Sequence, residues 1–312
     1  MRLSVVVVNW NLRDELEECL EALRGQTHRD LEVVVVDNAS TDGSAPLVET
    51  KFSEYALLKQ EHNLGFAEGC NRGIAACTGE WIAMLNNDAV ADPDWAAALA
   101  HRAETALPAC GMLQSLMLFK QKPDVINSTG IELGPDGGGR DRDEGLPRTA
   151  STTEAEIFCC TAGAAAYRRA MLEEVKLSTG YFDRHHFLYS EDLDLGWRAR
   201  LAGWSAVYVP DAIVYHRYHA SSDRHGPRWL ATMGRANRIR TLLKNASWGF
   251  LARTTPYSLV SFAEMFWYGR VRAPAALLGA LHSGLASRRQ VTALCKETRR
   301  SVEKRWISRR GK

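Results

Sequence analysis

The sequence has no long uncharged stretch and no cysteine spacing typical of disulfide frameworks or zinc sites. None of its 312 residues lies in a charge-free window of about 20 residues, so we expect no membrane-spanning helix. The seven cysteines show no Cys-x-x-Cys spacing, and Cys159 is adjacent to Cys160, which suits neither a disulfide framework nor a zinc site. We therefore expect reduced thiols and an intracellular protein. The apolar stretch of residues 3–8 runs directly into Asn9 and Asn11, so it does not resemble a signal peptide.

A dinucleotide-binding glycine motif is also missing. Residues 4–9 read as a buried strand, and Asn9-Trp10-Asn11 stands where a Gly-x-Gly-x-x-Gly turn would bring a helix close to a pyrophosphate. This absence argues against a hydride-transfer enzyme. The glycines come later, in residues 62–73, where a tight turn before a closely packed helix explains them as well as a ligand-binding loop does.

The charge is unevenly distributed along an otherwise ordinary globular composition. Apolar residues make up 46% of the chain and charged residues 24%. Residues 235–312 carry 17 Lys/Arg against 3 Asp/Glu, a net charge of +14, whereas the first 234 residues carry 22 against 34, a net charge of −12. A basic tail on an acidic body suggests contact with something anionic. We expect no nucleic-acid partner, because the body is acidic and no recognition module is visible.

The first half of the sequence alternates apolar β-branched runs with helical periodicity. This alternation predicts an α/β fold, with a mainly parallel sheet covered by helices on both faces. We expect strands at residues 4–9, 31–37, 55–60 and 80–86, and helices at 14–24, 42 onward and 69–77.

The second half is less regular. Residues 134–149 are rich in glycine and charge and predict a mobile loop. We expect helices at 162–175 and 191–202, short strands at 206–209 and 212–215, and mainly helix from Trp229 onward.

Polar clusters follow two of the apolar strands, at the edge where open parallel sheets bind ligands. In Asp37-Asn38-Ala39-Ser40, Asp37 suits either a turn or cap, or a hydrogen bond to a base or ribose. Asn86-Asn87-Asp88 offers more polar groups than a cap requires. Hard divalent cations take oxygen ligands and share them with phosphates. We therefore expect Asp88 to hold a cation that bridges a nucleotide diphosphate.

A third acidic cluster, containing Glu191, Asp192 and Asp194, begins the helix expected at 191–202. The helix dipole favours acidic residues in a first turn, which explains some of them structurally. Three carboxylates within four residues repel one another, which tends to raise one pKa toward the strength of a general base. His216 suits either a metal ligand or a structural group, and His186 either lines an acceptor or contributes to packing.

Taken together, these motifs resemble glycosyltransferase family 2, the inverting, metal-dependent family with the GT-A fold. The resemblance runs from about residue 3 to 222 through Val5-Val6-Val7-Val8-Asn9-Trp10-Asn11, Val36-Asp37-Asn38-Ala39-Ser40, His62-Asn63-Leu64-Gly65-Phe66-Ala67, Leu85-Asn86-Asn87-Asp88 and Tyr189-Ser190-Glu191-Asp192-Leu193-Asp194. The rhamnosyltransferase-like branch, which builds cell-surface polysaccharides, is similar in Gly180-Tyr181-Phe182-Asp183 and Arg235-Ala236-Asn237-Arg238-Ile239.

The resemblance implies a GT-A catalytic domain at residues 1–228 and a basic helical extension at 229–312. Within the domain, residues 1–110 would form the nucleotide-sugar half and residues 111–228 the acceptor and catalytic half. A cytoplasmic enzyme, peripheral on the inner face of the plasma membrane, fits this organisation.

The resemblance also assigns a role to each matching residue. Asp192 matches the catalytic base, and Asp88 and His216 match the ligands of Mn²⁺ or Mg²⁺. Asn86 replaces the first acid of the family's Asp-x-Asp motif, which leaves fewer charges on the metal and gives His216 more weight. The donor would lie along Asn9, Asp37, Asn63, Gly65, Asn71 and Asn87, whereas Glu191, Asp194 and His186 would support the acceptor side.

The implied reaction is the transfer of one sugar, with rhamnose as a candidate, from a UDP- or dTDP-linked donor to a hydroxyl of a glycan or lipid-linked acceptor. The Gln-x-x-Arg-Trp motif of processive synthases is missing, because Arg228-Trp229 lacks the glutamine. The alternatives are a sugar-phosphate nucleotidyltransferase, which would need a basic Gly-rich loop after the first strand, and a non-catalytic assembly partner at the membrane.

The tail has two interpretations. Residues 256–284 are apolar and aromatic, and residues 287–312 are strongly basic. An amphipathic helix beside a basic segment fits an anionic membrane surface, which residues 256–312 would contact. Packing on the catalytic domain or on a second copy in a homodimer explains the same composition.

Overall fold

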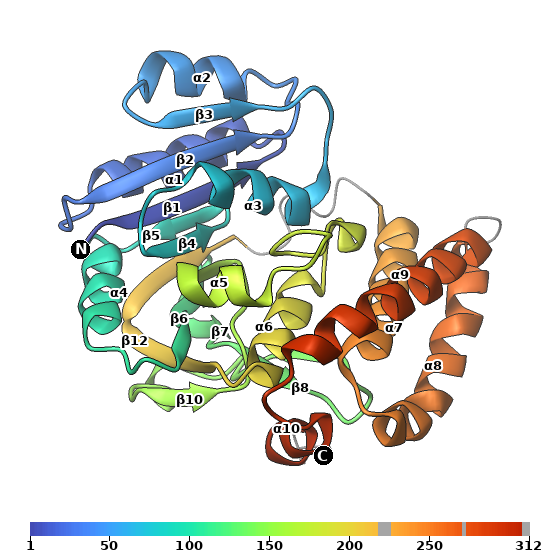
Figure 1. Ribbon diagram of the computed structural model, residues 1–312. Helices are drawn as coiled ribbons and strands as arrows, with labels where there is room; N and C mark the ends of the chain where they lie inside the picture. The colour runs from blue at the N-terminus through green and yellow to red at the C-terminus, as the bar shows by residue number, and fades with distance from the viewer. Residues whose placement is uncertain (218–225, 270–272, 308–312) are drawn as a thin grey trace.

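The computed structural model describes residues 1–217, 226–269 and 273–307, with the side chains of 268 and 269 outside the description. The sheet and its flanking helices occupy one side of the molecule, and the C-terminal helices form a lobe on the other (Figure 1). The central sheet has the strand order β10-β12-β6-β11-β4-β1-β2-β3, with β5 added on β12 and β7 on β6. The predicted α/β class is confirmed.

The N-terminal half contains the parallel part of the sheet. In it, β4 pairs with β1, β1 with β2, and β2 with β3, all in parallel. The elements are β1 (Leu3–Asn9), α1 (Arg13–Arg24), β2 (Leu31–Asp37), α2 (Ser44–Lys51), β3 (Ala56–Lys59), α3 (Gly65–Ala76), β4 (Trp81–Leu85), β5 (Ala89–Ala91) and α4 (Trp95–Glu104).

The rest of the sheet is mixed. β11 inserts antiparallel between β4 and β6, and β12 runs parallel to β6. The elements are β6 (Cys110–Phe119), β7 (Lys122–Ser128), β8 (Ile131–Leu133), β9 (Gly139–Asp141), η1 (Arg148–Ala150), β10 (Ala155–Ile157), β11 (Ala164–Arg168), α5 (Arg169–Val175), η2 (Arg184–His186), α6 (Glu191–Leu201) and β12 (Ser205–His216).

The valine runs divide between two hydrophobic cores, one on each face of the sheet. Val6 and Val8 of β1 pack into the core beneath α3, α5 and α6, whereas Val5 and Val7 pack into the core beneath α1, α2 and α4. A strand buried on both faces needs an unbroken apolar sequence. The polar residues Asn9 and Asp37 therefore stand where these strands leave the sheet.

Two predictions for the second half were wrong. The stretch 162–175 is a helix only from Arg169, because Ala164–Arg168 forms β11, and two strand ladders outweigh the helix propensity of alanine. The stretch 134–149 is structured. It includes β9, which pairs with β8, and its Gly137 (φ +80°) packs against Leu242.

Smaller corrections concern boundaries. α3 begins at Gly65, four residues before the predicted start, and the two strands expected at 206–209 and 212–215 form one strand, β12. Its register with β6 shifts between Val209 and Ile213. The seven cysteines are free thiols, and six of them are buried.

The C-terminal elements are α7 (Pro227–Asn245), α8 (Trp248–Gly269), α9 (Ala273–Leu294) and α10 (Arg299–Trp306). α7 contacts α6, α8 and α9, and α10 contacts α6, so these helices pack on the catalytic region. α8 lies at the outer edge of the lobe (Figure 1). Within the three described segments, no helix has both the length and the apolar composition to cross a membrane. The boundary at 228/229 stays a prediction.

Candidate active site

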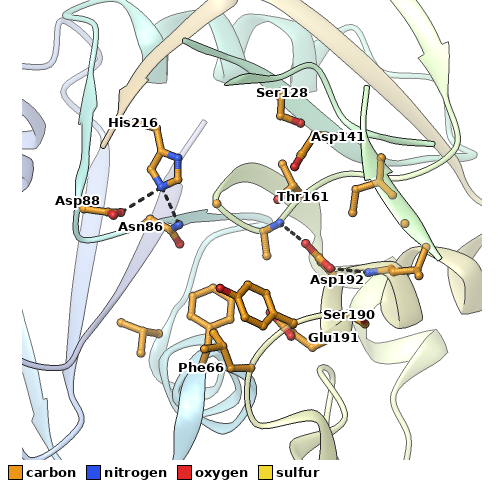
Figure 2. A pocket seen from close by; sticks show the side chains of 18 of the residues that line it. Phe66, Asn86, Asp88, Ser128, Asp141, Thr161, Ser190, Glu191, Asp192 and His216 are labelled. Carbon is orange, nitrogen blue, oxygen red and sulfur yellow. Dashed lines mark hydrogen bonds and ion pairs between the residues drawn. The ribbon is translucent and has the colours of Figure 1, made fainter. Parts of the chain in front are cut away.

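A cavity of about 420 Å³ opens where β1, β2 and β4 end and where α3 and α6 begin. Its wall includes Asp88, Asp192 and His216, which are far apart in the sequence. Figure 2 shows Asp88 and His216 together on one side of the cavity and Asp192 on the other. The size is typical of a small-ligand site.

The first side is built by strand pairing. β5 pairs with the end of β12, so that His216 lies opposite Ala89, the residue after Asp88. His216 Nε2 lies 3.1 Å from Asp88 Oδ1 and 3.2 Å from Asn86 Nδ2, while its Nδ1 lies 2.8 Å from Asn127 Oδ1. Because Asn127 Oδ1 can only accept, we assign the hydrogen to Nδ1, which leaves the Nε2 lone pair to accept from Asn86 Nδ2 beside the Asp88 carboxylate.

This arrangement fits a divalent cation. Asp88 Oδ1 and His216 Nε2, which lie 3.1 Å apart, are both atom types that bind divalent cations. Two adjacent ligands of an octahedral ion with bonds of about 2.1 Å are about 3 Å apart, which matches this separation. A metal-binding histidine normally donates its other ring N–H to an acceptor, as His216 does to Asn127.

The opposite side is the N-terminus of α6. Asp192 Oδ1 accepts from Leu193 N at 2.7 Å and Oδ2 from Ala162 N at 3.3 Å. Burial raises the pKa of Asp192, and these backbone hydrogen bonds oppose the rise. Burial, followed by the charge of Asp192, raises the pKa of Glu191 well above its usual value. Glu191 Oε2 is buried without a hydrogen-bond partner among the described residues.

The loop before α6 is strained and firmly held. Phe187, Tyr189 and Ser190 have φ values of +60°, +72° and +66°, which non-glycine residues rarely adopt. The Nδ2 atom of Asn237 on α7 lies 2.8 to 2.9 Å from the carbonyl oxygens of His186, Leu188 and Tyr189. At the other end, the Phe187 carbonyl accepts from Phe66 N in the first turn of α3.

The predicted donor residues are only partly brought together. Among the described residues, Asn63, Gly65 and Asn87 line the cavity, whereas Asn9, Asp37 and Asn71 do not. Asn9 lies between two of the others: its Nδ2 donates to Asp37 at 3.2 Å, and its Oδ1 accepts from Asn87 at 2.6 Å. Asn9 and Asp37 thus support the wall of the cavity.

The amide of Asn71 pairs with both backbone groups of Phe182, at 2.8 and 2.9 Å. The expectation that Asn71 lies along the donor does not match this geometry, because its amide is already used to tie α3 to the segment before η2.

Asp194 and His186, which were expected to support the acceptor side, do not line the cavity. Both are fully buried. Lys244 Nζ donates to Asp194 at 3.0 Å and also to Asp183, and Arg198 Nε donates to Asp194 at 3.1 Å. Burial would raise the pKa of Asp194, but Lys244 and Arg198 outweigh it and hold that pKa below its usual value.

Asp183, His186 and Asp194 also have ligand atoms close enough to one another to bind a metal. The ammonium group of Lys244 already lies between the two carboxylates, however, and His186 Nε2 is 2.9 Å from Thr241 Oγ1. The cluster is therefore a structural ion network that links α7 to α6.

The sequence analysis missed Asp141, which lines the cavity from β9. Burial, followed by the charge of Asp192, raises its pKa to about 6. Ser128 lies next to it in Figure 2. Alternating charge in Arg140-Asp141-Arg142-Asp143 was a weak signal for a hairpin, and the surrounding glycines obscured it.

The geometry therefore places Asp88 and His216 opposite the buried Asp192 carboxylate across one small-ligand cavity. The sequence model of "Glycosyl transferase family 2" matches residues 4–176, more than half of the chain. The chain belongs to glycosyltransferase family 2. It is an enzyme of glycosyl transfer, and the nucleotidyltransferase alternative is not supported.

Relatives of this glycosyltransferase agree with the branch inferred from the sequence. The N-acetylglucosaminyl-diphospho-decaprenol L-rhamnosyltransferase of Mycobacterium tuberculosis is 28% identical over 79% of this chain and 86% of its own length. The amylovoran biosynthesis glycosyltransferase AmsE of Erwinia amylovora is 25% identical over 82% of this chain and 91% of its own length. The resemblance to the rhamnosyltransferase-like branch is confirmed.

Solved structures share the fold of this glycosyltransferase. The mannosyltransferase PcManGT from Pyrobaculum calidifontis, in complex with GDP-Man and Mn²⁺, is 21% identical with a TM-score of 0.53 and covers 94% of this chain and 78% of its own. TarS of S. aureus, residues 1–349 with UDP-GlcNAc, is 18% identical with a TM-score of 0.56 and covers 95% of this chain and 84% of its own. The GT-A fold is confirmed.

Proposed function

We propose that this glycosyltransferase moves one sugar, with inversion, from a nucleotide-diphosphate donor to an acceptor hydroxyl, with Asp192 as the base and Asp88 and His216 as metal ligands. The observation that carries the proposal is the shared cavity, which has Asp88 and His216 on one wall and the buried Asp192 carboxylate on the other.

The chain's own residues divide the work of such a reaction. Asp192 would accept the proton of the acceptor hydroxyl as that oxygen attacks the anomeric carbon, and burial, which raises its pKa, makes it a stronger base than an exposed aspartate. Mn²⁺ or Mg²⁺ at Asp88 and His216 would neutralise charge on the departing diphosphate. Trp10, Asn38, Asn63 and Asn87 of the cavity wall would contact the nucleotide.

L-rhamnose on a dTDP or UDP carrier is the donor we propose to test first, and a lipid-linked glycan the first acceptor. The rhamnose and the lipid-linked acceptor follow from the name of the Mycobacterium tuberculosis relative, whose sequence aligns with most of this chain. A role in polysaccharide synthesis at the cytoplasmic face of the membrane would follow from such an acceptor.

Donor screening tests the donor and metal parts together. With Mn²⁺ present, the true donor at about 100 times its Kd should stabilise the folded enzyme by about 2.7 kcal/mol, seen as a rise in Tm. Asp88→Ala should abolish the metal-dependent part of this rise, because it removes a ligand of the cation.

Asp124→Ala is the matched control, since Asp124 is exposed on β7 and does not line the cavity. A metal-dependent Tm rise that Asp88→Ala leaves intact would contradict the metal assignment.

A further inference from the structure

The helix α8 turns apolar side chains outward around most of its circumference. It packs inward through a narrow stripe that includes Thr254, Ser261 and Met265. Its exposed large side chains are Tyr257, Leu259, Val260, Phe262, Phe266 and Trp267, with Trp267 82% exposed. A helix facing water normally shows the opposite pattern. An exposed apolar surface of this extent marks an interaction site.

Almost no charge interrupts this surface. Glu264 is the only charged residue between 254 and 267, and its carboxylate is paired with Arg235 of α7 at 2.6 Å. The neighbouring helix α9, which contacts α8, also exposes two large apolar side chains, Leu278 and Leu285. We call the exposed residues 257–267 of α8 and 278–285 of α9 the apolar face.

A basic hollow lies at the other end of α8. Trp248, in the first turn of α8, lines it together with side chains of α9, α10 and their connection, among them Arg288, Lys296, Arg299, Arg300 and Glu297. Four of these five side chains are cationic. Three of them also have partners within the protein, because Lys296 pairs with Glu174 at 2.7 Å, and Arg288 and Arg299 donate to carbonyl groups at the end of α7. Cationic side chains next to an exposed apolar helix complement the interface of an anionic membrane, where apolar groups enter the acyl boundary and cations meet lipid phosphates.

The apolar face lies near the cavity. Phe187, which lines the cavity, packs edge-to-face on Trp229 at the start of α7, with ring centroids 5.6 Å apart. Arg235, which is six residues or about 9 Å further along α7, holds Glu264 of α8. The cavity is joined to the lobe a second way: Arg238 of α7 donates to the carbonyl of Asp136, in the turn before Arg140 of the cavity wall, and to Ser261 of α8 at 3.3 Å.

We propose that the apolar face and the basic hollow lie in the interface of an anionic membrane, with α8 parallel to the surface. This orientation presents the cavity to a lipid-linked acceptor whose chain stays in the bilayer. The acceptor part rests on the proposed function, whereas the membrane contact itself does not.

Flotation with vesicles tests the contact. The full-length enzyme should float with vesicles of phosphatidylcholine and phosphatidylglycerol, and less with phosphatidylcholine alone or in high salt, because screening weakens the cationic part. The double variant Leu259→Ser/Trp267→Ser should reduce the vesicle-bound fraction about tenfold. Leu107→Ser is the matched control, since Leu107 is equally exposed but precedes β6, in the catalytic region.

Activity separates this proposal from the proposed function. In the double variant, transfer to a long-chain acceptor in vesicles should fall, while transfer to a water-soluble short-chain acceptor should match wild type. A wild-type enzyme that transfers no sugar to the soluble acceptor would contradict the proposed function, and this result would leave the vesicle-binding result unchanged.

Three results would overturn the membrane assignment: wild-type enzyme that stays with the soluble fraction, a double variant that floats as wild type does, or a dimer in sedimentation equilibrium that the double variant dissociates. The last result would assign the apolar face to a second copy of the chain. An unchanged thermal melt of the double variant would show that it remains folded.

Discussion

At the scale of single residues, neighbouring carboxylates have different environments. Asp192 receives backbone hydrogen bonds from Leu193 and Ala162, which stabilise its charged form. Glu191 is buried, and one of its carboxyl oxygens lacks a hydrogen-bond partner among the described residues. Burial raises the pKa of Glu191, and the nearby charge of Asp192 raises it further. Environments that push two pKa values apart assign different roles to two acids. We infer that Glu191 holds a proton more readily than Asp192, which leaves Asp192 as the base of the pair.

Glu191→Gln should test this inference through stability. A carboxyl group with a raised folded-state pKa binds more protons in the folded than in the unfolded state, so its stabilising contribution is full below the ordinary value of 4.5 and is lost as pH rises. Glutamine resembles the protonated acid and cannot ionise. The Tm of the variant should therefore exceed that of wild type by a few degrees at pH 8, and the difference should shrink toward pH 5.

Glu191→Gln should also retain transfer activity within about tenfold of wild type, because a neutral side chain remains. Thermal melts across this pH range check the stability prediction, and parallel curves for the two proteins would refute it.

At the scale of elements, α7 positions the catalytic segment from outside. The Nδ2 atom of Asn237 lies within 2.9 Å of three carbonyl oxygens of the strained loop that leads into Asp192, and its two hydrogens are shared among them. Residues in such conformations cost about 1–3 kcal/mol each and persist only when their surroundings fix them. Asn237 is thus a positioning residue rather than a catalytic one.

Asn237→Ala should lower kcat by about 10- to 100-fold, with a much smaller effect on donor affinity, because the loop carries the base and not the nucleotide site. Asn237→Asp keeps the shape but replaces the donating group with an acceptor, so it should be as damaging as alanine. Steady-state kinetics with donor binding measured separately would check this. Wild-type kcat in Asn237→Asp would rule out the clamp.

The sequence predicted the elements whose signals are local. Apolar runs ending in Asp37 and in Asn86-Asn87-Asp88 indicated the parallel strands and the ligand-binding edge, because a strand buried on both faces has few alternatives. β11 was missed because its alanines favour a helix locally, and only the flanking strands β4 and β6 make them a strand. Asp141 was missed for the same reason, since the β8–β9 pairing and the contact of Gly137 with Leu242 order the hairpin.

At the scale of the whole molecule, the C-terminal helices are part of the catalytic structure. Lys244 and Asn245 of α7 both bond to Asp194 on α6, the helix that begins with Glu191 and Asp192. Removing one member of a buried ion network typically costs about 3–5 kcal/mol. The composition of the C-terminal tail suggested a separate region, but α7 of this tail supports the active site. Its α8 exposes the apolar face.

The sequence could not reveal this division of the tail. Composition alone marked residues 256–312 as apolar and then basic. Only three-dimensional contacts separate Met265, buried against α7 and α9, from Trp267, which is exposed. The same composition pattern includes positions whose side chains the structure does not describe, namely Tyr268, Arg270, Arg272 and residues 308–312.

The transfer rate of Asp192→Asn, measured together with metal-dependent donor binding, tests the central claim most directly. The substitution keeps the shape of the side chain but removes its ability to accept a proton. We predict that transfer falls about 10²- to 10⁴-fold, while donor binding in Mn²⁺ stays at its wild-type strength because Asp88 and His216 are untouched. An Asp192→Asn enzyme that transfers sugar at the wild-type rate would contradict the account.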